Sequence, residues 1–247
     1  MDVIGVIPAR YASTRLEGKV LVDLAGKPMI RRVWERARKA KLLDDLLVAC
    51  DDERIAETVK GFGGKAVMTA KAHTCGTDRI AEAVYPLDAR AVVNIQADEP
   101  LLQPVMIDQL AQALLSDDSA SMFTLAKRIE KREEITDPNV VKVVLDKNNL
   151  ALYFSRSAIP YHAAGSRVDA PVYYKHIGMY GYTKDFLFTY KNMPPSSLER
   201  TEKLEQLRVL EAGCRIKVIE TRYETIGVDT AEDLERVKAA IEAAGDK

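Results

Sequence analysis

The sequence predicts an α/β fold in which a mainly parallel sheet carries helices on both faces. Up to about residue 100, strand-like runs alternate with helix-like runs across short connections, which is the signature of a parallel sheet. The strand-like runs are apolar throughout, as in strands that are buried on both faces. With 247 residues, of which 47% are hydrophobic, the chain is also long enough to bury a sizeable core.

The first part of the chain supplies most of this parallel sheet. The expected strands are 3–7, 46–50, 66–69 and 91–95. The expected helices are 28–39, one through Ile55, Val59 and Phe62, one capped by Thr77 or Asp78, and 104–115. Ligands of such sheets bind at the carboxyl ends of the strands. The loops after residues 7, 69 and 95 are therefore the ones expected to carry function.

The character of the chain changes after about residue 120. Strands are expected at 122–126, 140–145, 151–154, 173–182 and 216–219, with helices at 198–212 (stopped by Gly213) and from Thr230, which forms a capping box with Asp233. Six tyrosines lie between residues 153 and 182, and we interpret them as core or subunit interface rather than as a ligand platform. This stretch predicts a smaller mixed-sheet lobe.

Composition excludes several classes of protein. The formal net charge of −1 gives no basic field for nucleic acid, so an anionic partner must be bound locally. Three widely spaced cysteines argue for a reducing compartment and against a disulfide framework or a zinc site. No apolar run approaches the ~20 residues that cross a bilayer, and the N-terminus does not resemble a signal peptide. We therefore expect a cytoplasmic protein without membrane insertion.

The stretch after the first strand favours phosphate binding. It contains Arg10, Ser13, Arg15 and Lys19 within a short segment that also includes Gly18. Backbone N–H groups, hydroxyls and cations at the end of a rigid strand suit a phosphate group. The alternative interpretation is a surface loop that happens to be basic.

Two carboxylates at strand-to-helix junctions suggest a metal site. Asp98 follows the strand expected at 91–95, and Asp229 precedes the last helix. Carboxylate oxygens there commonly hold a divalent cation, although Asp229 could instead be an acid at a helix N-terminus. Glu99 could share the metal or bond the backbone. Since P-loop, protein-kinase, G-x-S-x-G and H-E-x-x-H signatures are lacking, the pattern favours metal-dependent nucleotidyl transfer.

Motifs along the whole length resemble the 3-deoxy-D-manno-octulosonate (Kdo) cytidylyltransferases. They include I-P-A-R-Y-A-S-T-R (7–15), G-T-D-R (76–79), D-E-P (98–100), A-L-Y-F-S-R-S-A-I-P-Y (151–161), K-H-I-G-M-Y-G-Y (175–182), L-E-Q-L-R (204–208) and G-V-D-T-A-E-D-L (227–234). Each is weak alone, but their order and spacing are specific, and sialic-acid activating enzymes share mainly the first.

The resemblance implies cytidylyl transfer from CTP to Kdo, with release of pyrophosphate, for lipopolysaccharide biosynthesis. It implies Lys19, Asp98 and Asp229 as catalytic residues, with Mg²⁺ on the two aspartates. The CTP-binding residues implied are Arg10, Ser13, Arg15, Lys19, Cys75, Gly76, Arg79 and Gln96. The sugar-binding residues implied are Arg156, His176, Tyr180, Glu205 and Gln206. Which cation meets the Kdo carboxylate is left open, although the fork of Arg156 suits it. His73 and His162 receive no role.

The family also implies a single nucleotide-sugar-transferase (Rossmann-like) domain over 1–247 and a homodimer. Residues 1–120 would be mainly the CTP-binding half, 121–195 the smaller sugar-binding and dimerisation lobe, and 196–247 the part that completes the site. The alternatives are transfer to another acidic sugar, such as 8-amino-Kdo or a sialic-acid relative, and a non-catalytic nucleotide-sugar binding protein.

The sequence departs from the family pattern at a few positions. Glu17 and Val20 stand where the family has prolines, Cys75 replaces a serine, and Ala97 replaces a glycine. A thiol is a weaker hydrogen-bonding group than a hydroxyl, and Ala97 would be costly only at positive φ. We expect activity to survive these changes.

Overall fold

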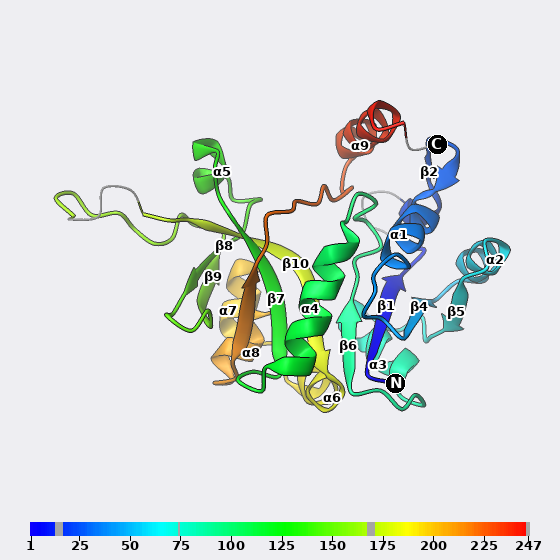
Figure 1. The fold of residues 1–247 in the computed structure, drawn as a ribbon, viewed down its shortest axis with the longest axis horizontal. Helices are drawn as coiled ribbons and strands as arrows, with labels where there is room; N and C mark the ends of the chain where they lie inside the picture. The colour runs from blue at the N-terminus through cyan, green and yellow to red at the C-terminus, as the bar shows by residue number, and fades with distance from the viewer. Residues whose placement is uncertain (13–16, 74, 167–170, 246–247) are drawn as a thin grey trace.

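Four parallel strands form the first part of the sheet in the computed structural model, which describes residues 1–12, 17–73, 75–166 and 171–245 (Figure 1). They are β1 (Val3–Ala9), β4 (Asp45–Cys50), β5 (Lys65–Met68) and β6 (Ala91–Asn94). Their order is β6-β1-β4-β5, and each pairs in parallel with its neighbour. The strands expected for this half are confirmed to within two residues at each end.

One long antiparallel strand joins this half to the rest of the sheet. It is β10 (Tyr174–Thr183), which pairs with β6 on one side and with β7 (Met122–Arg128) on the other. Strand β11 (Ile216–Glu220) adds in parallel to β7. Strands β8 (Lys142–Leu145) and β9 (Ala151–Ser155) extend β10 as an antiparallel pair. The expected mixed-sheet lobe is therefore an extension of the main sheet.

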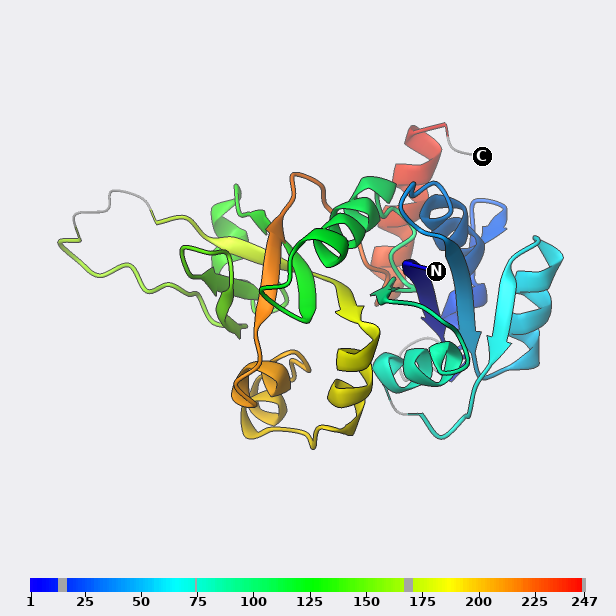
Figure 2. The same cartoon turned by 60° about the horizontal axis from the view of Figure 1, so that its bottom comes forward.

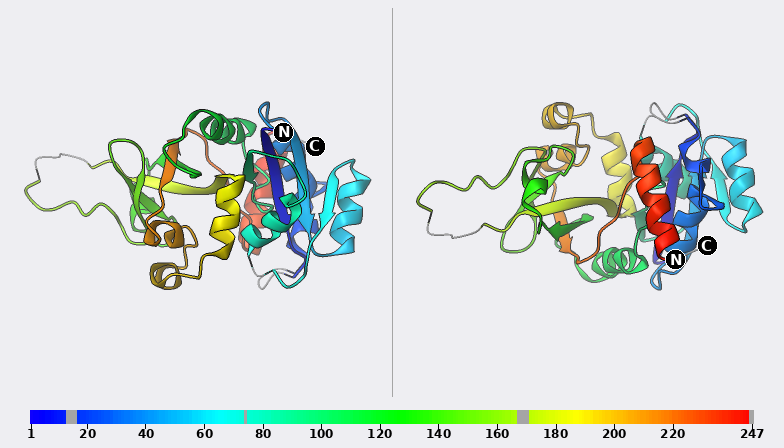
Figure 3. Two further views of the ribbon diagram at one scale, coloured as in Figure 1. Left: turned by 90° about the horizontal axis from the view of Figure 1, so that it is seen from below. Right: turned by 90° about the horizontal axis from the view of Figure 1, so that it is seen from above.

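Helices cover both faces of the sheet, as predicted. The first face carries α1 (Met29–Ala37), α2 (Glu53–Gly61) and α4 (Pro104–Ser116), whereas the second carries α3 (Gly76–Val84) and α6 (Lys184–Asn192). Figure 3 shows α4 and α6 on opposite sides. Strand β1 alternates between the two cores, because Val3 and Ile7 pack on one face and Ile4 and Val6 on the other. Helix α6 and the short α5 (Arg132–Thr136) were not expected from the sequence.

The expected helix over 198–212 is wrong, because the structure has two short helices instead. They are α7 (Ser197–Glu202) and α8 (Leu207–Glu211), separated at Lys203, which adopts a left-handed conformation (φ 57°, ψ 46°). Leu198 of α7 packs against the same hydrophobic core that buries Leu204 and Leu207 after the break, so the apolar spacing resembles that of one long helix. The predicted stop at Gly213 is confirmed, since its φ of 76° follows the end of α8.

The C-terminal helix packs on an early hairpin of the chain, away from the N-terminus. After β11, a strap over residues 221–230 leads to α9 (Ala231–Ala243), whose predicted capping box between Thr230 and Asp233 is confirmed. Val237 and Ile241 of α9 pack on Leu24 in a hairpin of β2 (Asp23–Leu24) and β3 (Lys27–Pro28). This small hairpin was not expected.

Residues 157–166 and 171–173 belong to an arm that projects from the body of the molecule (Figure 1 and Figure 2). Tyr161 on this arm is 86% exposed. None of the helices in the described ranges combines the length and apolarity that a bilayer-spanning helix requires.

Candidate active site

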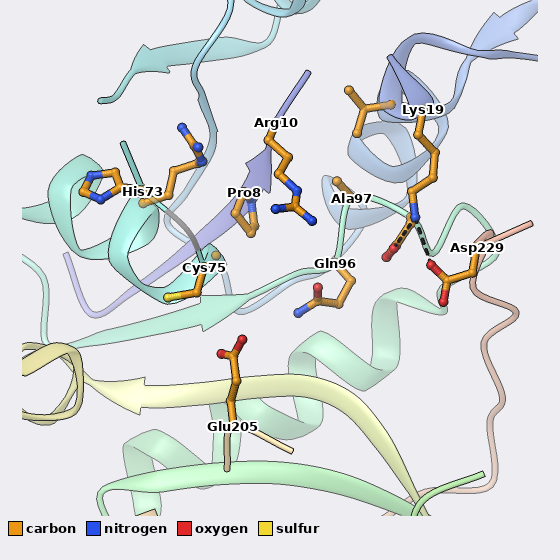
Figure 4. Close-up of a pocket in the computed structure, with 13 residues that line it drawn as sticks. Pro8, Arg10, Lys19, His73, Cys75, Gln96, Ala97, Glu205 and Asp229 are labelled. Atoms are coloured by element: carbon orange, nitrogen blue, oxygen red, sulfur yellow. Dashed lines mark hydrogen bonds and ion pairs between the residues drawn. The ribbon is translucent and has the colours of Figure 1, made fainter. Parts of the chain in front are cut away.

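A polar cavity of about 280 Å³ lies at the carboxyl ends of the parallel strands. The loops after β1, β5 and β6 all reach it, as the sequence predicts, and they are joined by residues from the C-terminal part (Figure 4). Its lining includes nine predicted site residues, namely Arg10, Lys19, Cys75, Gly76, Arg79, Gln96, Asp98, Glu205 and Asp229. Ser13 and Arg15 lie outside the described residues. The topology of the sheet thus gathers side chains that are far apart in the sequence.

Lys19 is the hub of this cavity. Its Nζ donates to Asp98 Oδ2 at 2.7 Å, to the carbonyl of Val228 at 2.7 Å and to Asp229 Oδ1 at 3.3 Å. The lysine side chain is only 13% exposed, so little water screens these contacts. The two aspartates proposed as metal ligands from the sequence therefore converge on one point, where the single ammonium group offsets one of their two negative charges.

The backbone conformation at Gly18 positions Lys19 between the two aspartates. Gly18 has a φ of 65°, and its N–H donates to the carbonyl of Tyr11 at 3.0 Å. A Cβ at Gly18 would lie 3.2 Å from the Tyr11 ring, so both the backbone and the space favour glycine. The short 3-10 helix η1 (Lys19–Leu21) begins directly after it, and Val20 is buried in the core. A valine in place of the family proline thus fills an apolar site.

The strap that carries Asp229 is fastened at both ends. The N–H of Val228 donates to the carbonyl of Asp98 at 2.9 Å, and the Val228 side chain is fully buried. Nearer β11, Glu224 accepts from Lys127 at 2.8 Å and pairs with Lys175 at 2.6 Å. Hydrogen bonds from these two lysines lower the pKa of Glu224 to about 2. The strap is therefore bonded to β7, to β10 and to the loop after β6.

Arg79 lines the cavity, as predicted, and its guanidinium is also bonded to the framework behind it. It lies in the first turn of α3 and is only 2% exposed. Its guanidinium donates to Asp51 Oδ2 at 2.9 Å and to Thr69 Oγ1 at 2.6 Å. Asp51 also accepts from the N–H of Tyr11 at 3.0 Å. Arg79 thus ties the ends of β4 and β5 to the first loop.

Two other departures from the family pattern, Ala97 and Cys75, differ in their effect on the structure. Ala97 is not among the described residues with positive φ, so replacing glycine costs no strain there. Cys75 is the N-cap of α3 but provides no side-chain cap, and burial raises the pKa of its thiol to about 11. The predicted cap of this helix by Thr77 or Asp78 is therefore wrong, and the thiol at the N-cap position is a weaker acceptor for the first-turn N–H groups than a serine hydroxyl.

A second cavity of about 330 Å³ adjoins the first. The two share Gly76, Gln96 and Glu205 in their linings. Tyr180, Glu205 and Gln206, three of the predicted sugar-binding residues, line the second cavity. The rings of Tyr182 and Tyr190 also line it and stack with centroids 6.0 Å apart. The tyrosines expected to be mainly core or interface therefore also form a cavity wall.

Arg156 and His176, the other two predicted sugar-binding residues, line neither cavity. Arg156 Nε donates to the carbonyl of Glu202 at 2.9 Å, and its Nη1 donates to that of Pro138 at 2.9 Å. His176 Nε2 lies 2.9 Å from Thr124 Oγ1, and burial lowers the pKa of the imidazole to about 3. The structure therefore places both residues outside the two cavities, with Arg156 bonded to backbone carbonyls and His176 neutral among neighbouring side chains, and their contacts with the sugar stay a prediction.

Two lining residues were missed as site residues, and the adjacent Glu99 was considered from the sequence only as a possible metal ligand. His73 lines the first cavity and bonds Glu82 on α3, and Lys203 lines the second. Glu99 is buried behind Asp98, and burial followed by the Asp98 charge raises its pKa to about 8. His73 stands two residues before the Cys75 motif, a signal that was available, whereas nothing local marked Lys203.

A parallel sheet with cations and carboxylates gathered at its carboxyl edge defines the chain as a nucleotidyltransferase. The Cytidylyltransferase family model matches residues 4–219. Proteins described as 3-deoxy-manno-octulosonate cytidylyltransferase are similar over almost the full length. One from Geotalea uraniireducens is 52% identical over 96% of this chain and 98% of its own. One from Syntrophobacter fumaroxidans is 52% identical over 96% of each.

A solved structure of CMP:2-keto-3-deoxy-manno-octonic acid synthetase complexed with CTP agrees with these relatives. It superimposes with a TM-score of 0.93 at 41% identity, covering 99% of this chain and 100% of that one. The chain belongs to the 3-deoxy-manno-octulosonate cytidylyltransferase family. The family resemblance noted from the motifs is confirmed.

Proposed function

We propose that this enzyme transfers the cytidylyl group of CTP to the anomeric hydroxyl of Kdo, giving CMP-Kdo and pyrophosphate. The observation that carries the proposal is the convergence of Lys19, Asp98 and Asp229 at the edge of the first cavity. Nucleotidyl transfer needs a cation at the phosphates and carboxylates that hold a metal, and the family supplies the substrates. The product would feed lipopolysaccharide biosynthesis, and since CTP is a cytoplasmic nucleotide, we expect the enzyme to act there.

The carboxylates fit a magnesium ion. Mg²⁺ is usually bound by one or two carboxylates together with waters and substrate phosphates, rather than by an all-protein cage. Asp98 and Asp229 already point at one cation, the Lys19 ammonium, and no group of three or more His, Cys, Asp or Glu suited to a metal occurs among the described residues. When bound there, magnesium would neutralise phosphate charge and lower the pKa of the sugar hydroxyl.

Other residues of the two cavities would bind the substrates. Arg10 is exposed at the end of β1 and has no hydrogen-bond partner within the described ranges, so its guanidinium is available for the triphosphate. Lys19 would leave its carboxylate partners and stabilise charge on the α-phosphate and the departing pyrophosphate. Gln96 and Gly76 line both cavities and therefore border the point where the two substrates would meet.

Pyrophosphate release from purified enzyme tests the proposal. With CTP, Kdo and Mg²⁺ we expect release that EDTA abolishes and that Asp98→Ala reduces at least about 100-fold. A panel of acidic sugars, including 8-amino-Kdo and a sialic acid, is the matched comparison. The proposal would be wrong if Kdo gave no pyrophosphate or if Asp98→Ala turned over normally.

We also propose a homodimer. The projecting arm carries Tyr161 at 86% exposure, and Leu152 on the edge strand β9 is 61% exposed. Exposed aromatic and aliphatic side chains of this kind are typical of subunit interfaces. Light scattering tests it, and a molecular mass of one chain at micromolar concentration would contradict it.

A further inference from the structure

Arg54, at the start of α2, lines neither cavity but lies directly over the side chain of Tyr11. Its guanidinium carbon is 3.4 Å from the centroid of the Tyr11 ring, which is a cation–π contact. Asp52 holds the guanidinium in that place, because its two oxygens accept from Nε at 2.7 Å and from Nη2 at 2.8 Å. Asp52 is also the N-cap of α2. The cation is therefore fixed over the ring from the first turn of a helix.

Tyr11 connects Arg54 to Gly18. The N–H of Tyr11 donates to Asp51 Oδ1 at 3.0 Å, and its carbonyl accepts from the N–H of Gly18 at 3.0 Å. Its ring lies against Gly18, since a Cβ built on that glycine would come within 3.2 Å of the ring. The ring therefore contacts Arg54 and Gly18 at once, and Gly18 is the residue that directly precedes Lys19.

The conformation of Gly18 decides where Lys19 points. Gly18 has a φ of 65°, and from there the Lys19 ammonium reaches Asp98 and Asp229. Helix α2 also contacts η1, the short helix that begins with Lys19. The contacts made by Arg54 and by the Tyr11 ring thus support the hub of the first cavity from the outside.

Glu17 makes this support more important in this chain. It is exposed and stands where the family pattern has a proline, whose ring would fix φ and restrict the chain next to Gly18. Glu17 supplies no such restraint. Hydrogen bonding to Asp52 raises the pKa of the Arg54 guanidinium, and the charge of Glu17 adds to that rise, so the Glu17 carboxylate lies within electrostatic reach of Arg54.

We propose that Arg54 and Tyr11 are positioning residues, which hold Gly18 and Lys19 in the arrangement that receives the phosphates of CTP. Neither residue lines either cavity, so they act through Gly18 and not by contact with the nucleotide. When the receiving arrangement is populated only in part before binding, the apparent affinity for CTP falls by that fraction. This assignment deepens the proposed function and rests on it.

Steady-state kinetics on a double-mutant cycle test the positioning role. Arg54→Met should raise the KM for CTP about 3- to 10-fold and leave kcat and the KM for Kdo unchanged, because bound nucleotide restores the arrangement. In the Glu17→Pro background the same substitution should change the KM for CTP by less than about 2-fold, since the proline ring supplies the missing restraint. Glu17→Gln removes the charge, keeps the backbone freedom and should not have this effect. Lys60→Met, at an exposed cation of α2, is the matched control.

Hydrogen exchange at the Gly18 amide follows the same cycle without any substrate. Arg54→Met should lower its protection about 3- to 10-fold, and Glu17→Pro should restore it. The amide of Ile95, which donates to the carbonyl of Val6 inside the sheet, should exchange as in wild type.

The outcomes separate the two proposals. The inference is overturned if Arg54→Met leaves the KM for CTP or the protection of Gly18 unchanged, or if Ile95 loses as much protection as Gly18. It is also overturned if Glu17→Pro fails to suppress the effect on KM, because Arg54 would then contact the nucleotide directly. If wild type released no pyrophosphate with Kdo, the proposed function would fail, and exchange at Gly18 would still decide whether Arg54 holds this segment.

Discussion

The two cavities are built in different ways. The first is assembled from short segments that directly follow parallel strands, and its charged residues, such as Arg10 and Asp98, stand next to those strands in the sequence. The second is assembled from β10, which runs against its neighbours, and from the turn between α7 and α8. A cavity at the ends of parallel strands can be located from the sequence, whereas one made by a crossing strand and a helix break requires the path of the chain.

The largest effect is expected at the hub of the first cavity. Lys19→Met should lower kcat/KM at least about 100-fold, because it removes the cation at the phosphates. It should also strengthen Mn²⁺ binding in the absence of nucleotide, since the ammonium no longer competes for Asp98 and Asp229. Electron paramagnetic resonance titration with Mn²⁺ measures this. Lys27→Met, which breaks a pair with Glu35 outside both cavities, is the control.

Unchanged Mn²⁺ affinity in Lys19→Met would contradict this account of the first cavity. It would mean that Asp98 and Asp229 do not bind the metal ion.

The next effect is expected behind the first cavity. Arg79→Met leaves the buried Asp51 carboxylate without its cation, and breaking such a buried pair costs about 3–5 kcal/mol. Urea unfolding measures the loss. Lys65→Met, which removes a pair with Asp45 in which the lysine side chain is 66% exposed, should change stability by less than about 1 kcal/mol. Similar losses in the two variants would show that the framework does not depend on the Arg79 contact.

A smaller effect is expected where the strap connects the two parts of the site. The folded pKa of Glu224 lies at about 2, below the model-peptide value of 4.5, so its contribution to stability is present above pH 4.5. That contribution is lost as the pH falls from about 4.5 to about 2. Glu224→Gln should therefore melt below wild type at pH 7, with the difference narrowing across that pH range. Thermal melting followed by circular dichroism tests this, and a pH-independent difference would contradict it.

The smallest effect is expected at Cys75, one of the residues in the first cavity that depart from the family pattern. Cys75→Ser should add an N-cap to α3 and stabilise the protein by about 0.5–1 kcal/mol. It should lower the KM for CTP by about 2- to 5-fold if the hydroxyl also contacts the nucleotide. Denaturant unfolding and steady-state kinetics measure the two effects. Cys214→Ser, which is not at a helix N-cap, is the control, and equal gains in both variants would refute the capping account.

Much of the first cavity could be predicted because parallel strands impose a common edge. The apolar runs of β1 and β6 placed Arg10 and Asp98 at that edge before any contact was known, and the capping box of α9 placed Asp229 at a helix start. The hydrogen bond between Arg79 and Asp51 could not be predicted. The two residues are 28 positions apart, and only the order of the strands brings them together.

The lining of the second cavity was less predictable from the sequence than that of the first. The register of β10 against β7 shifts between Ile177 and Tyr180, an irregularity that alternation of side chains does not anticipate. His176 is consequently packed among Phe154 and Thr124, with Tyr180 beside it at the cavity. The break at Lys203 was hidden because Leu198 of α7 packs against the same core that buries Leu204 and Leu207, with a spacing that resembles one long helix.

The sequence by itself determined the α/β class, the parallel half of the sheet, the family and the charged edge of the first cavity. These follow from local periodicity and from motifs, which depend on residues close together in the chain. Only the tertiary structure decided that Lys19 lies between Asp98 and Asp229, that Arg79 and Arg156 are bonded to the framework, and that Lys203 lines the second cavity. Each of these depends on which distant segments share a surface, and that is fixed by strand order, a β-strand irregularity and a helix break rather than by local pattern.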